Sequence, residues 1–282
     1  MSKSRILIFA ILLIFLCPQI CLAWGPVVHL REGLYLLENT KLIISTIGEI
    51  ILRYPYYFLY GCISPDIFIG KGKKISKTHS HNWDTGFKLI SSNDLNIKSY
   101  GYGYLTHLAA DVIAHNFFIP NMLQLYKLNR GKFFHILIEG IVDAKININK
   151  DVVKDLLNIK LKKADKVLLK IVRKNKGIFF LKKMVFKKGL NFNLQKINIS
   201  NYRLKIEKKI DEMNDYIEDM IMLSRRAEID LLNNLSRSQI VNYDPMGFKN
   251  LKIAQKSNRL FFKARYKGVV PFFVPSISLL NM

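Results

Sequence analysis

Residues 101–118 read GYGYLTHLAADVIAHNFF. His107, Asp111 and His115 recur in it at steps of four residues. Four residues of an α-helix advance only about 40° around the axis, so the three side chains fall along one stripe. Imidazole and carboxylate groups are typical zinc ligands. The stretch therefore predicts a helix that carries a stripe of metal ligands.

A second apolar segment carries a similar pair of polar residues. Residues 133–145 read FFHILIEGIVDAK, which places His135 and Glu139 one helical turn apart. Two polar groups on a face flanked by Phe and Ile side chains are costly to bury unless they are paired or bind a metal. This segment is therefore predicted to be a helix that supplies further ligands.

The chain contains six histidines, and all of them lie in residues 1–140: His29, His79, His81, His107, His115 and His135. A single histidine is more often a core or surface residue than a ligand. Their confinement to one half of the chain favours a shared metal site. Three short motifs upstream of the ligand stripe contain the remaining candidates: WGPVVH at 24–29, GCISPDIF at 61–68 and THSHNWD at 78–84.

The beginning of the chain has the pattern of a secretory signal peptide. Lys3 and Arg5 precede an unbroken apolar run over residues 6–17, and the small residue Ala23 follows. The apolar run is shorter than the roughly 20 residues of a membrane-spanning helix. We therefore expect cleavage after Ala23 and export to the periplasm or the extracellular space. Cys17 and Cys21 lack the preceding small residue of a lipid-modified cysteine, so a lipoprotein is the less favoured alternative.

Cleavage after Ala23 would make Trp24 the first residue of the mature protein. A free α-amino group has a pKa of about 7.7 to 8.0, which is low enough for it to bind zinc at neutral pH. The amine and the carbonyl of one terminal residue can chelate a metal together. The same cleavage would leave Cys62 as the last cysteine, which excludes a disulfide framework and indicates a small buried thiol.

Taken in order along the chain, these motifs resemble the zinc-dependent phospholipase C family, which shares an all-α fold and a three-zinc site with the S1/P1-type single-strand nucleases. The resemblance covers roughly residues 24–145 and implies nine metal-binding positions. It assigns one zinc to Asp66, His81, His107 and Asp111. It assigns a second to His29 with the amine and carbonyl of Trp24, bridged to the first by Asp111. The third falls to His115, His135 and Glu139.

The resemblance also implies a role for Asp66 beyond zinc binding, because the family's carboxylate at this place is proposed to act as a base. His81 is preferred to His79 because it begins the family-like motif HNWD. His79 is interpreted as a loop histidine beside the basic run at residues 71–77. In the related proteins the histidine after the bridging aspartate lies further along the chain, so the departure at His115 puts the third zinc in question.

Metal-activated water is the chemistry that such a ligand set supports. Closely spaced zinc ions bind the oxygens of a phosphodiester and lower the pKa of a bound water toward about 7. No serine or cysteine nucleophile is then needed. The sequence contains no nucleophile elbow, phosphate-binding glycine loop or dinucleotide fingerprint.

The second half of the chain is strongly basic. Residues 1–140 contain 14 Lys and Arg against 8 acidic residues, whereas residues 141–282 contain 30 against 13. This charge would attract an anionic membrane surface or a polyanion. Residues 151–172 and 202–232 show the periodicity of amphipathic helices. We interpret them as solvated helices that cover the metal core. The alternative is a membrane-surface face around residues 178–180, formed by Lys154, Lys160, Lys162, Lys163, Lys166, Lys170, Lys182, Lys183, Lys187 and Lys188.

The apolar tail after Gly268 is interrupted by Pro271 and Pro275, which excludes a membrane-spanning helix and favours packing on the domain. We expect a signal peptide at 1–23, a zinc-binding region at 24–150 and a basic helical region at 151–282. The last is expected to belong to the same domain or to pack on it.

Three functions remain open from the sequence, and none includes a protein partner. The favoured one is a phospholipase C-like hydrolase of phospholipid head groups. A single-strand nuclease is the second, and it requires aromatic platforms for bases, for which Tyr102, Tyr104, Phe117 and Phe118 are candidates. A non-catalytic zinc protein of the same fold is the third.

Overall fold

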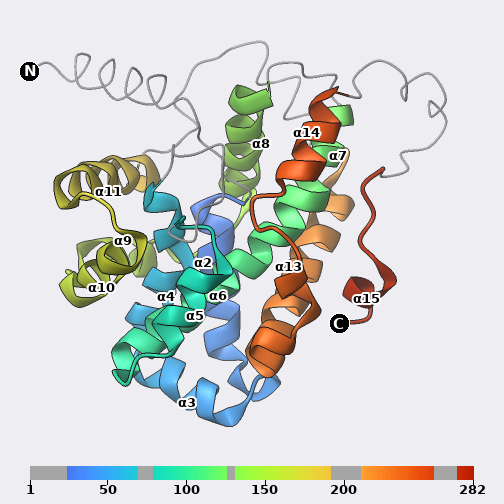
Figure 1. The fold of residues 1–282 in the computed structure, drawn as a ribbon. Coiled ribbons are helices and arrows are strands. Elements are labelled where there is room, and N and C mark those ends of the chain that lie inside the picture. The colour runs from blue at the N-terminus through green and yellow to red at the C-terminus, as the bar shows by residue number, and fades with distance from the viewer. Residues whose placement is uncertain (1–23, 69–78, 126–130, 192–210, 257–271) are drawn as a thin grey trace, which may run out of the picture.

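The computed structural model describes residues 24–68, 79–125, 131–191, 211–256 and 272–282 (Figure 1). Throughout these ranges helices are the only regular secondary structure, which confirms the predicted all-α fold. The predicted signal peptide, residues 1–23, lies outside the described residues.

The first half of the chain forms helices α2 (Pro26–Glu38), α3 (Ser45–Arg53), α4 (Pro55–Ile63), α5 (Trp83–Ile90), α6 (Leu95–Ile113), α7 (Ile119–Leu125) and α8 (Gly131–Lys145). The second half forms α9 (Lys150–Asn158), α10 (Lys162–Val172), α11 (Lys176–Asn191), α13 (Asn214–Asn234), α14 (Phe248–Lys256) and α15 (Ile277–Leu280). Two short elements each contain a candidate ligand, the 3-10 helix η2 (Ser64–Phe68) with Asp66 and the π-helix η3 (Ala114–Phe118) with His115.

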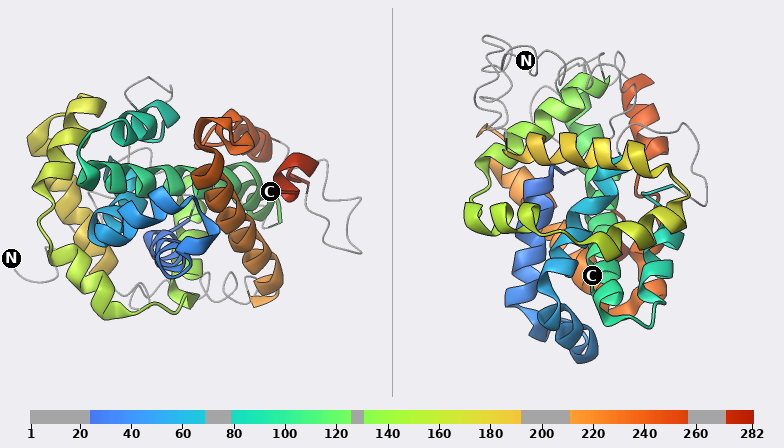
Figure 2. Two further views of the ribbon diagram at one scale, coloured as in Figure 1. Left: turned by 90° about the horizontal axis from the view of Figure 1, so that it is seen from below. Right: turned by 90° about the vertical axis from the view of Figure 1, so that its left-hand side faces the viewer.

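Helix α6 lies at the centre of the molecule, with other helices around it (Figures 1 and 2). Asp94 is the N-cap residue of α6, and its side chain accepts a hydrogen bond from Asn96 N at 3.0 Å. Leu105 belongs to a hydrophobic cluster shared with α7, α8, α13 and α14. Leu108 belongs to a second cluster shared with α2, α3, α4 and the helices α9 to α11. Polar residues of α6 are therefore enclosed between two apolar cores.

Glycines bring α4 and α6 unusually close together. A Cβ atom at Gly103 would lie 1.9 Å from the carbonyl oxygen of Phe58, and one at Gly61 would lie 2.2 Å from that of Tyr100. Each of these distances is shorter than any tolerable contact, so neither position accepts a side chain at this separation of the helices. Gly101 faces the other neighbour, α5, where its Cβ would lie 2.8 Å from Leu89 Cβ.

The predicted ligand stripe is not one uninterrupted α-helix. Helix α6 ends at Ile113, and His115 lies in the π-helix η3. A wider turn disturbs the regular backbone hydrogen bonds. Here Asn116 Nδ2 donates to Val112 O at 2.9 Å, and Asn250 Nδ2 donates to Asn116 O at 2.9 Å. Gly247 (φ +54°) packs against this turn, where a Cβ would lie 2.3 Å from the carbonyl oxygen of His115.

The basic second half is helical but segmented. The amphipathic stretch at 151–172 forms two helices, because the backbone is extended at Ile159 and Leu161 turns into the core before α10 begins. The start of the other predicted helix, residues 202–210, lies outside the described residues, and α13 covers residues 214–232 of the remainder. The break allows α9 and α10 to pack in the same cluster as α2 and α4.

The end of the chain packs on α7. Asn121 Oδ1 accepts hydrogen bonds from the backbone N–H groups of Phe272 and Phe273 at 3.0 and 2.9 Å, and Leu279 is buried. This agrees with the expectation for the tail. None of the helices in the described ranges combines the length and the apolar character needed to cross a bilayer.

Candidate metal centre

Helix α6 supplies two of the predicted ligands from successive turns. His107 and Asp111 are both buried, and His107 Nε2 lies 3.1 Å from Asp111 Oδ2. Because α6 runs between two apolar clusters, water does not solvate these polar groups. Their charge and hydrogen-bonding capacity must be satisfied within the protein or by a bound ion.

Two further predicted ligands reach the same point from outside α6. Asp66 lies in η2 directly after α4, and His81 lies just before α5. His81 Nε2 is 3.2 Å from Asp66 Oδ1 and 3.2 Å from Asp111 Oδ2. His107 Nε2 is 3.6 Å from Asp66 Oδ1. Donor atoms of four residues thus converge on one small volume.

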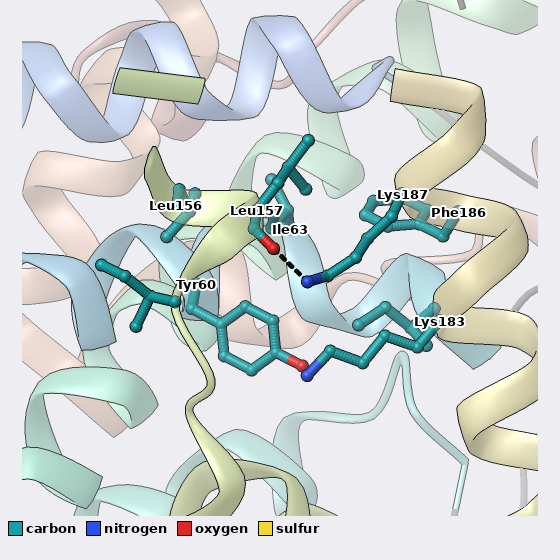
Figure 3. A pocket seen from close by; sticks show the side chains of 9 residues that line it. Tyr60, Ile63, Leu156, Leu157, Lys183, Phe186 and Lys187 are labelled. Carbon is teal, nitrogen blue, oxygen red and sulfur yellow. Dashed lines mark hydrogen bonds between the residues drawn. The ribbon is translucent and has the colours of Figure 1, made fainter. Parts of the chain in front are cut away.

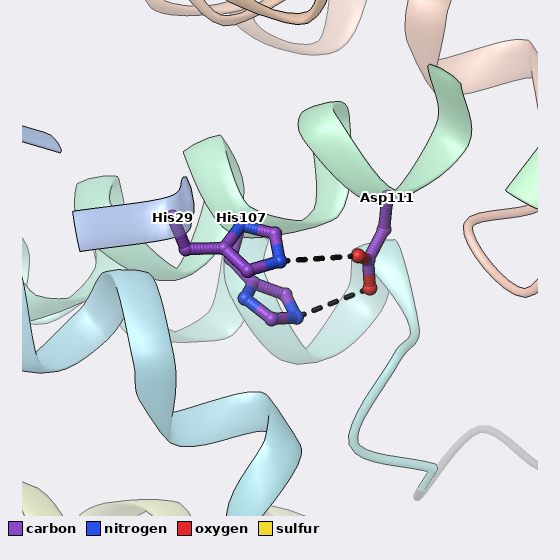
Figure 4. A group of neighbouring side chains, drawn as sticks. All are labelled: His29, His107 and Asp111. Carbon is purple, nitrogen blue, oxygen red and sulfur yellow. Dashed lines mark ion pairs between the residues drawn. The ribbon is translucent and has the colours of Figure 1, made fainter. Parts of the chain in front are cut away.

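His29 approaches Asp111 from the other side (Figure 4). It lies on α2, its ring stacks on that of His107 with centroids 3.9 Å apart, and its Nε2 is 3.4 Å from Asp111 Oδ1. Asp111 therefore presents Oδ1 to His29 and Oδ2 to His81 and His107. This is the geometry of a carboxylate placed between two groups of ligands.

The imidazole rings are oriented by contacts behind them. His107 Nδ1 lies 2.8 Å from the carbonyl oxygen of Cys62, which accepts a hydrogen bond from the ring N–H. His81 Nδ1 lies 3.1 Å from Ser80 Oγ. For His107, the carbonyl acceptor places the ring proton on Nδ1 and leaves the Nε2 lone pair directed toward the centre. The close approach of α4 to α6 brings the Cys62 carbonyl into position.

The electrostatics of the cluster favour a cation. Burial disfavours the charge on Asp111, but His107, His29 and His81 outweigh burial and hold the pKa of Asp111 well below its usual range. Burial alone would lower the pKa of His81, whereas hydrogen bonds to Asp111 and Asp66 raise it to about 10. The pKa of His107 is likewise raised by Asp111 and Asp66, so protons on His81 and His107 balance the carboxylates, and a metal ion would take over that positive charge.

The donor set fits zinc. Asp66 Oδ2 and His29 Nδ1 are buried and have no hydrogen-bond partner among the described residues. Two groupings, His29 with His107 and Asp111, and Asp66 with His81 and His107, place their ligand atoms within 4.8 Å of one another. Histidine nitrogens and aspartate oxygens are ligands that zinc prefers.

The ligands predicted for a third zinc are described only in part. His115 and Glu139 are buried, whereas the side chain of His135, on α8, lies outside the described residues. Burial lowers the pKa of His115 to about 4, which favours the neutral imidazole that binds metals. Burial, with Asp66 nearby, raises the pKa of Glu139 well above its usual range. A cation beside Glu139 would remove that penalty.

Trp24 is held by its side chain. The indole is fully buried, stacks on Phe118 with ring centroids 4.5 Å apart, and donates from Nε1 to Ser224 Oγ at 3.0 Å. These contacts fix the residue at the start of α2, one turn before His29. The sequence predicts that the backbone of Trp24 binds metal. It gives no sign that the indole ring anchors the residue.

Asp143 positions the helix that carries His29, and the sequence did not predict this role. It accepts hydrogen bonds from Val27 N and Val28 N, each at 3.1 Å, and so caps α2 from α8. The residue at the N-cap position is Gly25, which has no side chain to cap the helix, and a Cβ there would lie 2.2 Å from Asp143 Cγ. The only available signal was its position one helical turn after Glu139.

Replacing Asp143 with alanine should destabilise the first turn of α2. Loss of both capping hydrogen bonds is expected to lower the free energy of unfolding by about 1 to 2 kcal/mol. Denaturant unfolding followed by circular dichroism measures this change. Asp143→Asn, which retains one acceptor oxygen, should lose less. Equal stability of Asp143→Ala and the wild type would contradict the capping role.

The structure places His81, and not His79, in the cluster. The His79 side chain is only partly buried, and its Nδ1 accepts a hydrogen bond from His81 N at 3.1 Å. We therefore expect His81→Ala to lose zinc, as measured by elemental analysis after removal of excess metal. His79→Ala is the matched control and should retain it. A loss of zinc in both variants would show that the two histidines share one role.

Comparison with known proteins gives one match. A family model described as zinc-dependent phospholipase C matches residues 28–219, a span that contains each of the candidate ligands except Trp24. No curated protein and no solved structure matches the chain.

Proposed function

Since this chain belongs to the zinc-dependent phospholipase C family, we propose that it is a zinc-dependent phosphodiesterase that cleaves the head-group phosphodiester of phospholipids. The position of Asp111 carries the proposal, because its two oxygens face His29 on one side and His81 and His107 on the other. Bound zinc ions would offset the charge of the phosphodiester and lower the pKa of a water toward about 7.

Asp66 is the residue that we assign to proton transfer. Its Oδ1 faces His81, whereas its buried Oδ2 has no hydrogen-bond partner among the described residues. A carboxylate oxygen so placed can orient the attacking water and accept its proton. The roles of the other candidate ligands are to hold the metal ions and, for His29 and Asp111, to keep two of them close together.

Lipid is preferred to single-stranded nucleic acid as the substrate. The four aromatic residues considered as base platforms, Tyr102, Tyr104, Phe117 and Phe118, are all buried, so bases cannot stack on them without rearrangement. The family match and the basic helices of the second half support a phosphate-bearing lipid. Under this proposal the protein is exported and residues 1–23 are removed, which frees the amine of Trp24 for zinc.

The activity is tested by assaying phosphatidylcholine vesicles and single-stranded DNA side by side. We expect release of the phosphorylated head group, its abolition by a chelator, and its recovery with zinc. Asp66→Asn should lower the rate by about 100-fold or more. Asp84→Asn, at an exposed position on α5, is the control and should behave as wild type. DNA cleavage alone would support the nuclease, and zinc binding without turnover the non-catalytic alternative.

A further inference from the structure

Helix α11 exposes apolar side chains on its outer face. Ile178, Phe180, Leu181 and Met184 are between 44% and 48% exposed. Residues 178, 181 and 184 follow one another at steps of three, and 180 and 184 are four apart, so the four form one continuous ridge. In Figure 2 (right) this helix runs across the side of the molecule that faces the viewer. A helix on the surface of a soluble domain normally presents polar groups there.

The inner face of α11 buries Phe179 in the hydrophobic core and also holds two lysines (Figure 3). Lys183 Nζ lies 2.6 Å from Asp165 Oδ2 and packs over the ring of Tyr60, 4.6 Å from its centroid. Lys187 Nζ donates to the carbonyl oxygen of Leu157. These contacts fasten α11 to α4, α9 and α10 in one rotational setting. The ridge therefore faces solvent because the opposite side of α11 is held against the neighbouring helices.

The surroundings of the ridge are strongly positive. Residues 160–190 contain 12 Lys and Arg and one acidic residue, Asp165, which is the partner of Lys183. Lys170 and Arg173, which precede α11, and Lys176, its first residue, are exposed. An apolar ridge with basic residues around it complements an anionic lipid surface, where acyl chains accept the apolar groups and phosphates accept the cations.

The ridge lies next to the candidate metal centre. A cavity of about 50 Å³ is lined by Ile178, Phe179 and Lys182 of α11 and by Phe68 and Ser80. Phe68 ends η2, the element that contains Asp66, and Ser80 contacts the ring of His81. Helix α11 thus lines a cavity together with chain neighbours of Asp66 and His81, while its outer side faces solvent.

We propose that α11 is a docking helix that seats the protein on anionic lipid surfaces beside its catalytic site. The proposal rests on the proposed function for its purpose, since a phospholipid substrate has to be reached at a membrane. Binding to an anionic lipid surface then depends on the ridge of α11 and on the charge of the lipid, whether or not the protein hydrolyses the lipid.

Vesicle flotation of the full chain tests the proposal. Binding to vesicles of equal parts phosphatidylcholine and phosphatidylglycerol should exceed binding to pure phosphatidylcholine and weaken with added salt. Leu181→Ser should weaken it by about fivefold, because roughly half of a leucine side chain no longer enters the lipid. Leu52→Ser is the matched control, since Leu52 is 52% exposed and belongs to α3, a helix that lies apart from α11 (Figure 1).

A fluorescence measurement separates insertion from adsorption. Met184→Trp should show quenching by lipids with brominated acyl chains, above the signal of Trp24 and Trp83 in the wild type. Wild-type binding by Leu181→Ser together with absence of this quenching would overturn the proposal. So would a dimer in sedimentation that Leu181→Ser dissociates, because a second copy would then cover the ridge.

Failure of docking and failure of the proposed function are distinguishable. If Leu181→Ser detaches from vesicles but hydrolyses a water-soluble phosphodiester at the wild-type rate, the docking role is supported. If the wild type binds anionic vesicles through α11 but hydrolyses no phosphodiester, docking stands and the enzymatic proposal fails.

Discussion

Asp111→Asn is expected to lose at least one zinc ion per chain and to retain less than about 1% of the wild-type activity. In the structure, Oδ1 of Asp111 faces His29 and Oδ2 faces His81 and His107. An amide keeps the shape of the side chain but replaces one charged oxygen by an NH₂ group, which cannot bind a metal. Mutation of residues that only hydrogen-bond to metal ligands typically lowers metal affinity or activity by about 10-fold to 100-fold. Asp111 is itself a candidate ligand between two ligand groups, so a larger loss is expected.

Elemental analysis and hydrolysis of phosphatidylcholine measure the two effects in the same preparation. Asp219→Asn, at an exposed position on α13, removes one negative charge from the chain without touching the cluster and is the control. A full zinc complement in Asp111→Asn would contradict the bridging role, whatever the activity.

Gly103→Ala should be the most destabilising of the substitutions considered, by about 3 kcal/mol or more. The added Cβ would lie 1.9 Å from the carbonyl oxygen of Phe58, which is backbone and cannot rotate away. Helices α4 and α6 would have to separate, and overpacking of this kind costs about 1 to 3 kcal/mol even where side chains can adjust. Separation would also withdraw the Cys62 carbonyl from His107 Nδ1, so zinc affinity should fall with stability.

Gly177→Ala is the matched control for Gly103→Ala. It lies in the first turn of α11, and its added Cβ would meet only Asn175 Oδ1, at 3.3 Å. Alanine is the better helix former, so this variant should be neutral or slightly more stable. Chemical denaturation compares the two, and similar unfolding midpoints for both variants would show that α4 and α6 tolerate a wider spacing.

The helical stripe of His107 and Asp111 could be predicted from the sequence because helix geometry converts a step of four residues into a shared face. Convergence of Asp66, His81 and His29 on that stripe could not be derived from periodicity, since these residues lie on other elements. Their order along the chain, through the family resemblance, predicted them as ligands of the same site. The structure brings these five residues together in one buried cluster.

Other features of the site depend on contacts between distant segments, for which one sequence gives no signal. The cap that Asp143 on α8 provides to α2 joins residues more than 100 positions apart. The π-helix at His115 is supported by Asn250 and Gly247 from the far end of the chain. A glycine or an aspartate in isolation has many uses, and only the folded arrangement identifies which of them applies.

The hydrogen bond from His107 Nδ1 to the Cys62 carbonyl has a consequence for sequence variation. The acceptor is a main-chain atom, so every amino acid at position 62 provides it. Saturation mutagenesis should accordingly find position 62 permissive for small side chains such as Ala and Ser. Positions 61 and 103, which bring that carbonyl to the imidazole, should accept glycine alone. Among related sequences we then expect Gly61 and Gly103 to be invariant, whereas no conserved polar side chain is needed at position 62.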